Sequence, residues 1–246
     1  MDKIVEVKNI SVSYKNHITK KEVIGCKNVS FSIDKGEIVG LLGESGCGKS
    51  TVAKAVMGLV KTNSGEIFHA SMHPQMIFQD PKNSLNPSMK ITRIIEEPLR
   101  IKGTYTKEER KAMVFDMMEK VGLDKELSSR YPDALSGGQR QRVSLAASLI
   151  LGCEFLVADE AVSALDMTIQ AQIIKLLKKM QKKMDLSILF ISHDLRLVYN
   201  ICDRIIVMKD GSVLETGLTK EIFWNPKTDY MKKLIEAEKN SIKQKA

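Results

Sequence analysis

A glycine-rich segment at residues 43–51 carries the residue types best suited to chemistry. It reads Gly-Glu-Ser-Gly-Cys-Gly-Lys-Ser-Thr, follows the apolar run Ile38–Leu42 and precedes a segment with helical character, Thr51–Leu59. Glycines let successive backbone N–H groups converge on phosphate oxygens, and the start of a helix adds partial positive charge. We therefore expect Lys49 to reach the β- and γ-phosphates of a nucleotide and Ser50 to ligate Mg²⁺. The expected nucleotide contacts here are Gly43, Glu44, Ser45, Gly46, Cys47, Gly48, Lys49, Ser50 and Thr51.

Two acidic residues directly follow a second apolar run, Phe155–Ala158. In open parallel sheets, ligands bind at the carboxyl ends of the strands. We expect Asp159 to hold the Mg²⁺ shell, usually through water, and Glu160 to orient or deprotonate the attacking water. Together with the glycine-rich segment, this pair predicts a nucleoside triphosphatase.

Cys47 lies within the glycine-rich segment and allows two interpretations. A thiol at a helix N-terminus beside Lys49 would have a lowered pKa and would be alkylated readily. Alternatively, the position tolerates cysteine for its small size. The spacing of the four cysteines suits neither a zinc site nor a disulfide framework, so reduced thiols in a cytosolic protein are expected.

The flanking elements must position these groups, and their patterns predict an α/β fold. Ile4–Val12 alternates imperfectly and Val29–Ile33 alternates with period two, as strands do. Residues from about 86 to 150 are mainly helical, and Thr106–Glu109 has the spacing of a capping box. Strands and helices then alternate, with a long helix over Met167–Met184. That helix has one apolar face and one lysine-rich face, which we interpret as solvated.

Composition sets broad limits on the function. The chain has 246 residues, of which 43% are hydrophobic and 28% charged, and its net charge is +8. This charge permits contact with nucleotide phosphates, nucleic acid or an anionic membrane surface, without choosing among them. No apolar run approaches the roughly 18–20 residues of a spanning helix. Because Glu6 and Lys8 interrupt the start, no secretory signal is expected there, and membrane association should come only through a partner.

Further motifs narrow the family. The segment Leu135–Arg142 reads LSGGQRQR, and it is accompanied in order by Tyr14, Gln79, Ser163–Asp166 and His193. With the glycine-rich segment and the acid pair, this set resembles the ATP-binding cassette (ABC) family over essentially the whole chain. The resemblance implies an ATP hydrolase that uses ATP and Mg²⁺.

The resemblance also implies the architecture. The fold would be a P-loop NTPase (RecA-like) core with an N-terminal antiparallel β-subdomain and an inserted α-helical subdomain. Residues 1–246 would form a single ABC ATPase domain, with the core at about 1–85 and 152–246 and the helical subdomain at about 86–151.

Individual roles follow from the same resemblance. Tyr14 would stack on adenine, and Gln79 would bridge Mg²⁺, the attacking water and the helical subdomain. His193 would hydrogen-bond the γ-phosphate and hold Glu160 or the water in place. The implied catalytic residues are Glu160, His193 and Lys49, and the implied metal ligands are Ser50, Gln79 and Asp159.

Three more residues would act between chains. In the family's head-to-tail dimer, Ser136 and Gly138 would donate to the γ-phosphate of a nucleotide held by a second ABC ATPase chain. Asp166 would lie at the same interface.

The segment Phe78–Pro87, which reads FQDPKNSLNP, most resembles the dipeptide, oligopeptide and nickel importer ATPases. That branch implies two transmembrane permease subunits, a second and non-identical ATPase chain, and an extracellular substrate-binding protein as an indirect partner. The chain would lie at the cytoplasmic face of the membrane and would not bind nucleic acid. The permease would dock near Gln79–Asn86, and cargo (peptide, nickel or a metal chelate) cannot be read from a subunit that never touches it.

Two other functions compete with the importer. A soluble ABC-type ATPase acting on nucleic acid or ribosomes would account for the positive charge, although such proteins usually have two cassettes or long coiled-coil insertions. A non-hydrolysing regulatory subunit is the other alternative, and the intact Lys49, Asp159, Glu160 and His193 argue against it.

Overall fold

The computed structural model describes residues 2–15, 22–78 and 85–243. The chain divides into two compact units, one formed by Met1–Met72 with Ser187–Ala246 and the other by His73–Leu186. Each unit contains both helices and strands, as expected for an α/β fold. The finer division into a core and an inserted helical subdomain stays a prediction.

The first unit begins with a three-stranded antiparallel sheet in the order β2-β1-β4. Its strands are β1 (Lys3–Lys15), β2 (Glu22–Asp34) and β4 (Ser64–His69). Ile10 of β1 pairs with Val29 of β2, and both side chains are buried, as the alternating patterns predicted. No strand was predicted for β4, because its side chains are exposed or half-buried and form no apolar run.

A second group of strands in the first unit carries the glycine-rich segment. Its neighbours run β7-β3-β8-β9, with β3 parallel to β7 and β8, and β9 antiparallel to β8. The bounds are β3 (Ile38–Leu42), β7 (Ser187–Ser192), β8 (Arg204–Lys209) and β9 (Ser212–Leu218). Every residue of β3 and β7 is buried. Burial on both faces explains why these strands read as unbroken apolar runs rather than as alternating ones.

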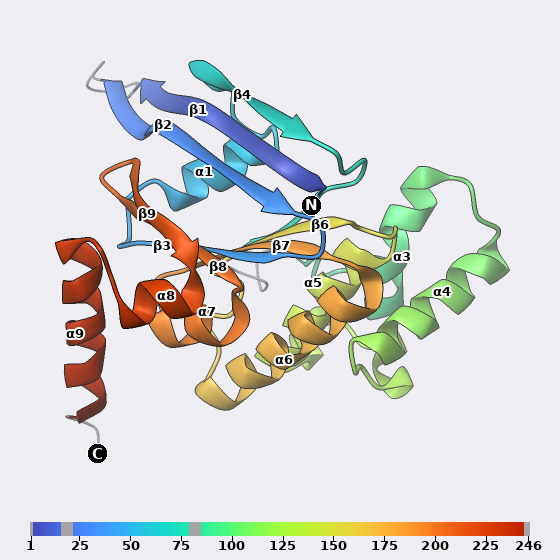
Figure 1. The fold of residues 1–246 in the computed structure, drawn as a ribbon. Coiled ribbons are helices and arrows are strands. Elements are labelled where there is room, and N and C mark those ends of the chain that lie inside the picture. The colour runs from blue at the N-terminus through green and yellow to red at the C-terminus, as the bar shows by residue number, and fades with distance from the viewer. Residues whose placement is uncertain (1, 16–21, 79–84, 244–246) are drawn as a thin grey trace. The chain divides into compact units, whose positions relative to one another are not determined.

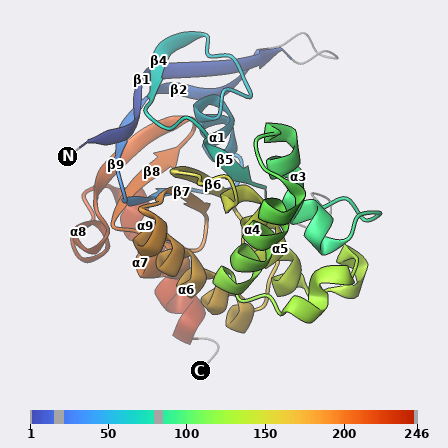
Figure 2. The ribbon, with the colours of Figure 1, turned by 90° about the vertical axis from the view of Figure 1, so that its right-hand side faces the viewer.

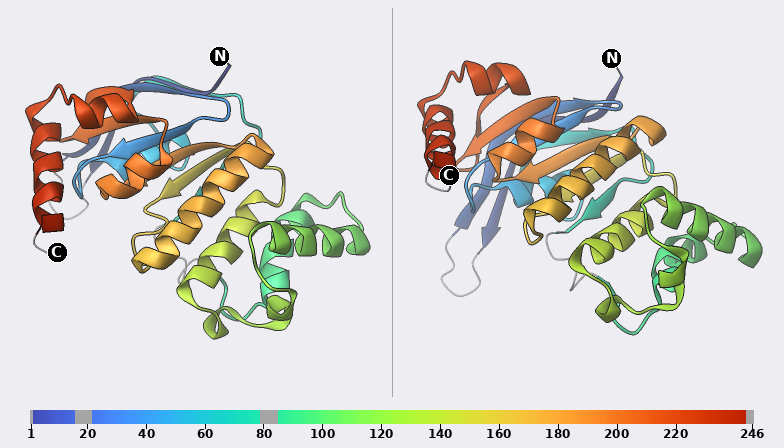
Figure 3. Two further views of the ribbon diagram at one scale, coloured as in Figure 1. Left: turned by 60° about the horizontal axis from the view of Figure 1, so that its bottom comes forward. Right: turned by 90° about the horizontal axis from the view of Figure 1, so that it is seen from below.

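Helices α1 (Lys49–Val56), α7 (Leu195–Ile201) and α8 (Thr219–Trp224) cover the faces of this strand group, and the last helix of the unit is α9 (Asp229–Lys243). Helix α1 contacts β1 and β2 and lies between the antiparallel sheet and β3 (Figure 1). On the other face, α7 contacts β3 and β7, and α8 contacts β8 and β9; Figure 3 shows these helices from below, followed by α9 in red.

The second unit is mainly helical. Its strands β5 (Gln75–Ile77) and β6 (Phe155–Asp159) pair in parallel. Its helices are α3 (Ile91–Lys102), α4 (Lys107–Lys120), η1 (Lys125–Ser129), η2 (Pro132–Ala134), α5 (Gly137–Leu149) and α6 (Met167–Met184). Helix α5 contacts α3, α4, α6 and β5, so it is the central helix of this unit (Figure 2).

Two helices match their sequence predictions closely. Helix α6 has the predicted bounds; Ile173, Leu177 and Met180 are buried on its apolar face, and all five of its lysines are exposed. Helix α4 starts at the predicted capping box, in which Thr106 and Glu109 bond each other's backbone N–H groups. The chain leaves α4 through Gly122, whose φ of 71° is accessible to glycine at little cost. No helix within the described ranges is long and apolar enough to cross a membrane.

The N-cap of α4 at Thr106 can be tested by substitution. Thr106→Ala removes the side-chain oxygen that accepts from the Glu109 N–H, so the free energy of unfolding should fall by about 1 kcal/mol. Thr104→Ala, at an exposed position in the same connection, is the matched control and should change it little. Urea unfolding of the full chain measures both; equal effects would contradict the capping role.

Candidate functional site

The phosphate loop, defined here as residues 43–51, owes its shape to glycines. Gly48 has φ 103° and directly precedes α1, and a β-carbon there would lie 2.1 Å from the carbonyl oxygen of Gly25 on β2. Gly43 is equally restricted, because its β-carbon would lie 2.3 Å from the Met208 carbonyl. Gly46 has φ 82° but open space around it. Only glycine fits at residues 43 and 48 without displacing backbone, and this close fit holds the loop against β2 and β8.

Lys49 is buried inside the loop. Its side chain is 5% exposed, and its ammonium donates to the carbonyl oxygens of Gly43 and Glu44, both at 2.8 Å. A buried charge needs such partners, since leaving water is costly without them. The Lys49 ammonium thus lies against the first residues of the loop, in the segment for which the sequence predicts contacts with phosphate oxygens.

One backbone hydrogen bond and one side chain join the loop to its surroundings, and two further backbone bonds support these contacts. The Gly211 N–H donates to the Cys47 carbonyl at 3.0 Å, and the Lys27 N–H donates to the Gly211 carbonyl at 2.8 Å. Within the loop, the Cys47 N–H donates to the Glu44 carbonyl at 3.3 Å. The Glu44 N–H donates to the Tyr230 hydroxyl at 3.1 Å, a contact that no sequence pattern indicated.

The structure decides between the two interpretations of Cys47. The thiol is buried, and desolvation raises its pKa even though the nearby Lys49 ammonium acts to lower it. The interpretation as a reactive, low-pKa thiol is therefore wrong. Cys26, Cys153 and Cys202 are also buried, and burial raises the pKa of Cys153 to about 12.

Tyr14 lies beside the phosphate loop, near the end of β1. Its hydroxyl donates to the Thr51 hydroxyl at 3.3 Å, and its ring passes so close to Gly25 that a β-carbon there would be 2.8 Å from the ring. The ring is 39% exposed. An exposed aromatic face next to the start of α1 is suited to stacking on a base.

Strand pairing brings His193 to the same sheet edge as the phosphate loop. Leu42, the last residue of β3, pairs with Ser192, the last residue of β7. Gly43 and His193 therefore leave neighbouring parallel strands at the same end. Asp194 then caps α7 by accepting from the N–H groups of Arg196 and Leu197, which fixes the direction of the chain after His193.

The two acids lie in the second unit, at the end of β6. Asp159 is its last residue and is 7% exposed. Glu160 follows with φ 46°, a left-handed conformation that costs a non-glycine residue about 1–2 kcal/mol. Its carbonyl accepts from the Ser163 N–H at 3.1 Å and from the Ser163 hydroxyl at 2.9 Å. Such strain at a candidate catalytic acid indicates that the placement of the side chain matters. Gln79, the other predicted contact with Mg²⁺ and the water, lies outside the described residues.

Two helix starts lie close together in the second unit. They belong to the segments Leu135–Arg142 and Ser163–Asp166. Ser136 caps α5 in a capping box with Gln139, and Asp166 caps α6 by accepting from the Ile169 N–H at 3.0 Å. Gly138 is buried, and a β-carbon there would lie 2.6 Å from the Ile169 side chain. The sequence analysis missed these capping roles, which the serine at 136 and the aspartate at 166 allow.

Comparison with known proteins adds the decisive observation. Residues 26–163 match the ABC transporter family. The oligopeptide transport ATP-binding protein OppF of Streptococcus mutans is 42% identical over 251 residues, covering 96% of this chain and 81% of that protein. This chain belongs to the ABC transporter family.

Solved structures of ABC proteins have the same fold. The protein cbiO1 from Clostridium perfringens, part of the ABC transporter complex cbiONQ, aligns with a TM-score of 0.81, 28% identity and 92% coverage of both chains. The ATP-binding cassette MJ0796, solved as a dimer in a post-hydrolysis state with ADP and Pi, aligns with a TM-score of 0.77 and 28% identity over 87% of this chain and 98% of that one. The predictions of a P-loop NTPase fold and of an ATP hydrolase are thereby confirmed.

Across the described stretches, no group of three or more His, Cys, Asp or Glu residues lies close enough to hold a metal ion. Mg²⁺ keeps several waters and usually takes one or two protein oxygens plus substrate phosphates. The Ser50 hydroxyl and the Asp159 carboxylate are oxygen groups of that kind.

Gly46 and Gly48 form a matched pair for testing the loop. Gly46→Ala has open space and should cost only the left-handed backbone, about 1–2 kcal/mol of unfolding free energy. Gly48→Ala must in addition displace the Gly25 carbonyl, so about 3 kcal/mol or more is expected. Urea unfolding of the full chain compares the two variants. Equal losses would contradict the close fit of the loop against β2.

Proposed function

We propose that this ABC ATPase is the ATP-binding subunit of an importer that couples ATP binding and hydrolysis to uptake of cargo through partner membrane subunits. The observation that carries the proposal is the buried Lys49 in its glycine-shaped loop, within a chain 42% identical to an oligopeptide transport ATP-binding protein. The name of that relative favours peptide over nickel or a metal chelate as cargo. It also favours the importer over an ATPase acting on nucleic acid or ribosomes.

In the proposed reaction, a water oxygen attacks the γ-phosphorus of ATP. The bond from that phosphorus to the β,γ-bridging oxygen breaks, and ADP and phosphate leave. The amides of the phosphate loop and the Lys49 ammonium hold the phosphates, and Tyr14 stacks on the adenine. Glu160 orients or deprotonates the water, and His193 hydrogen-bonds the γ-phosphate.

Mg²⁺ would be held by Ser50, Gln79 and Asp159, and it would neutralise charge on the β- and γ-phosphates. The burial of Asp159 supports this role, because a carboxylate near a cation tolerates loss of water. Ser50 is exposed in the first turn of α1, next to Lys49.

A second ABC ATPase chain, non-identical in the branch that the sequence resembles, would complete the site. Ser136 is exposed at the start of α5, and its oxygen accepts from the Gln139 N–H, so the hydroxyl proton would donate to a nucleotide on another chain. Asp166 is exposed at the start of α6 and would lie at the same interface. The dimeric form of MJ0796 supports this arrangement.

The membrane partners would be two permease subunits, with an extracellular substrate-binding protein acting through them. A groove of about 390 Å³ on the second unit, lined by Phe78 and Leu85 among others, supports permease docking on this unit. Phe78, Leu85, Ile94 and Pro98 supply its apolar surface, and Phe78 is 47% exposed. Docking there would hold the chain at the cytoplasmic face of the membrane as a peripheral subunit.

The role of Lys49 can be tested by equilibrium binding. Lys49→Ala removes the buried ammonium, and the Kd for MgATP should rise by about 10- to 100-fold. Lys54→Ala changes an exposed lysine of the same helix and should leave the Kd unchanged. Isothermal titration calorimetry on the full chain measures both, and unaltered binding by Lys49→Ala would sink the assignment of the ATP site.

The role of Glu160 can be tested by separating binding from hydrolysis. Glu160→Gln keeps the size of the side chain but removes its basicity, so ATPase activity should fall by about 100-fold or more while MgATP binding persists. Glu154→Gln, at an exposed position before β6, is the control. Phosphate release is measured with the assembled transporter. A fully active Glu160→Gln complex would show that another group activates the water.

A further inference from the structure

One residue of the phosphate loop connects Lys49 to the last helix of the chain. The Glu44 carbonyl accepts from the Lys49 ammonium at 2.8 Å, while the Glu44 N–H donates to the Tyr230 hydroxyl at 3.1 Å. Tyr230 lies in the first turn of α9, 186 residues further along the chain. The orientation of the Glu44 backbone is thus set from both sides, by Lys49 within the loop and by Tyr230 from outside it.

The Tyr230 ring is itself held in place. The Lys209 ammonium lies 5.2 Å from the ring centroid, within the range of a cation–π contact. Burial raises the pKa of the Tyr230 hydroxyl, so the group stays neutral near pH 7. A neutral hydroxyl can accept from the Glu44 N–H without placing negative charge beside a phosphate.

The start of α9 is anchored by Glu215 of β9, which is buried. Its carboxylate accepts from the Lys227 N–H at 2.8 Å, and from the N–H and hydroxyl of Thr228 at 3.1 and 2.8 Å. Burial acts to raise the pKa of Glu215, but these hydrogen bonds outweigh it and the pKa is lowered. The carboxylate is therefore ionised at neutral pH and fixes the two residues before α9.

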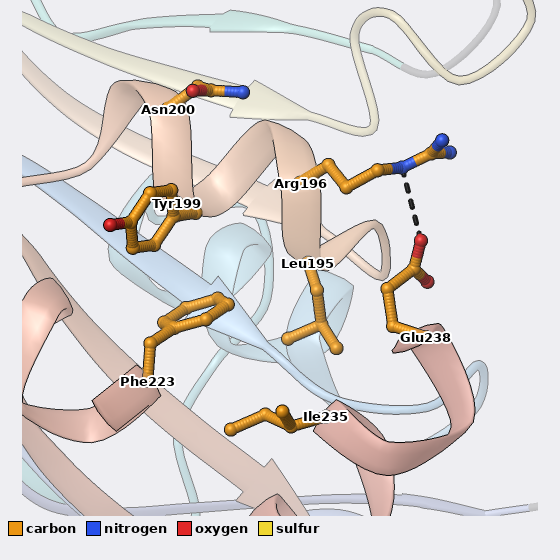
Figure 4. Close-up of a pocket in the computed structure, with 7 residues that line it drawn as sticks. All are labelled: Leu195, Arg196, Tyr199, Asn200, Phe223, Ile235 and Glu238. Carbon is orange, nitrogen blue, oxygen red and sulfur yellow. Dashed lines mark ion pairs between the residues drawn. The ribbon is translucent and has the colours of Figure 1, made fainter. Parts of the chain in front are cut away.

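A second contact holds α9 further along its length. Arg196 of α7 pairs with Glu238 of α9 and with Asp194, each at 3.1 Å, and Figure 4 shows the pair with Glu238. Below this ion pair, a pocket of about 220 Å³ lies between α9 and helices α7 and α8. Because the Arg196 side chain is 49% exposed, the ion pair contributes little to the free energy that holds α9 in place. The contact that reaches the loop is the one made by Tyr230.

We propose that Tyr230 is a positioning residue for ATP binding, whose hydroxyl fixes the Glu44 peptide and so preorganises the phosphate loop. The inference rests on the proposed function of that loop as the ATP site. A loop already held in its binding conformation loses less freedom when the nucleotide binds. Because Glu44 is exposed, water replaces part of the lost hydrogen bond, and the effect of removing the hydroxyl is moderate.

The test is Tyr230→Phe in the full chain, which keeps the ring and removes only the hydroxyl. The Kd for MgATP is expected to rise by about threefold to tenfold, as the loss of one neutral hydrogen bond implies. In the assembled transporter, KM for ATP should rise by the same factor while kcat stays near the wild-type value. Tyr199→Phe, which keeps the ring contact with Phe223, is the matched control and should leave Kd and KM unchanged.

Two outcomes would overturn the proposal. The first is an unchanged Kd for Tyr230→Phe. The second is a lower thermal midpoint with reduced kcat and unchanged KM, which would mark a purely structural hydroxyl. Lys49→Ala, measured in parallel, separates this proposal from the proposed function. Loss of binding by Lys49→Ala with normal binding by Tyr230→Phe defeats only the role of Tyr230, whereas normal binding by Lys49→Ala defeats both.

Discussion

The close approach of β2 to the start of α1 is the constraint on which the phosphate loop depends. The Gly25 carbonyl occupies the space where any residue but glycine at position 48 would place its β-carbon. This approach makes the chain turn sharply into α1, so that Lys49 folds back over the loop and reaches the Gly43 and Glu44 carbonyls. The antiparallel sheet therefore shapes the phosphate loop through its backbone, and it also carries Tyr14 beside that loop.

Parallel strand pairing supplies the rest of the arrangement in each unit. The end of β3 lies beside the end of β7, which brings the phosphate loop and His193 to one edge of the first unit. In the second unit, Ile77 pairs with Ala158, so that Phe78 and Asp159 lie at the same end of the two strands. When buried parallel strands pair in register, their ends lie together. Polar residues that follow these strands then gather at one place although they are far apart in sequence.

The sequence was informative wherever a local pattern determined the structure. Helix α6 was predicted with its bounds because its buried face has a regular period, and α4 because Thr106 and Glu109 form a capping box. Strand β5 was missed because three residues are too few to show a period. For Cys47, local reading offered two interpretations, because it could count the neighbouring lysine but could not see the burial. The contact between Glu44 and Tyr230 joins segments 186 residues apart, and no local pattern encodes it.

The left-handed backbone at residue 160 has an evolutionary consequence. Glycine adopts φ near 46° without the penalty that a β-carbon brings, so selection for stability alone would favour glycine at this position. Such a protein would gain folding free energy and lose the carboxylate proposed to handle the water. A library screened only for thermal tolerance would therefore enrich glycine at this codon, at the expense of that carboxylate.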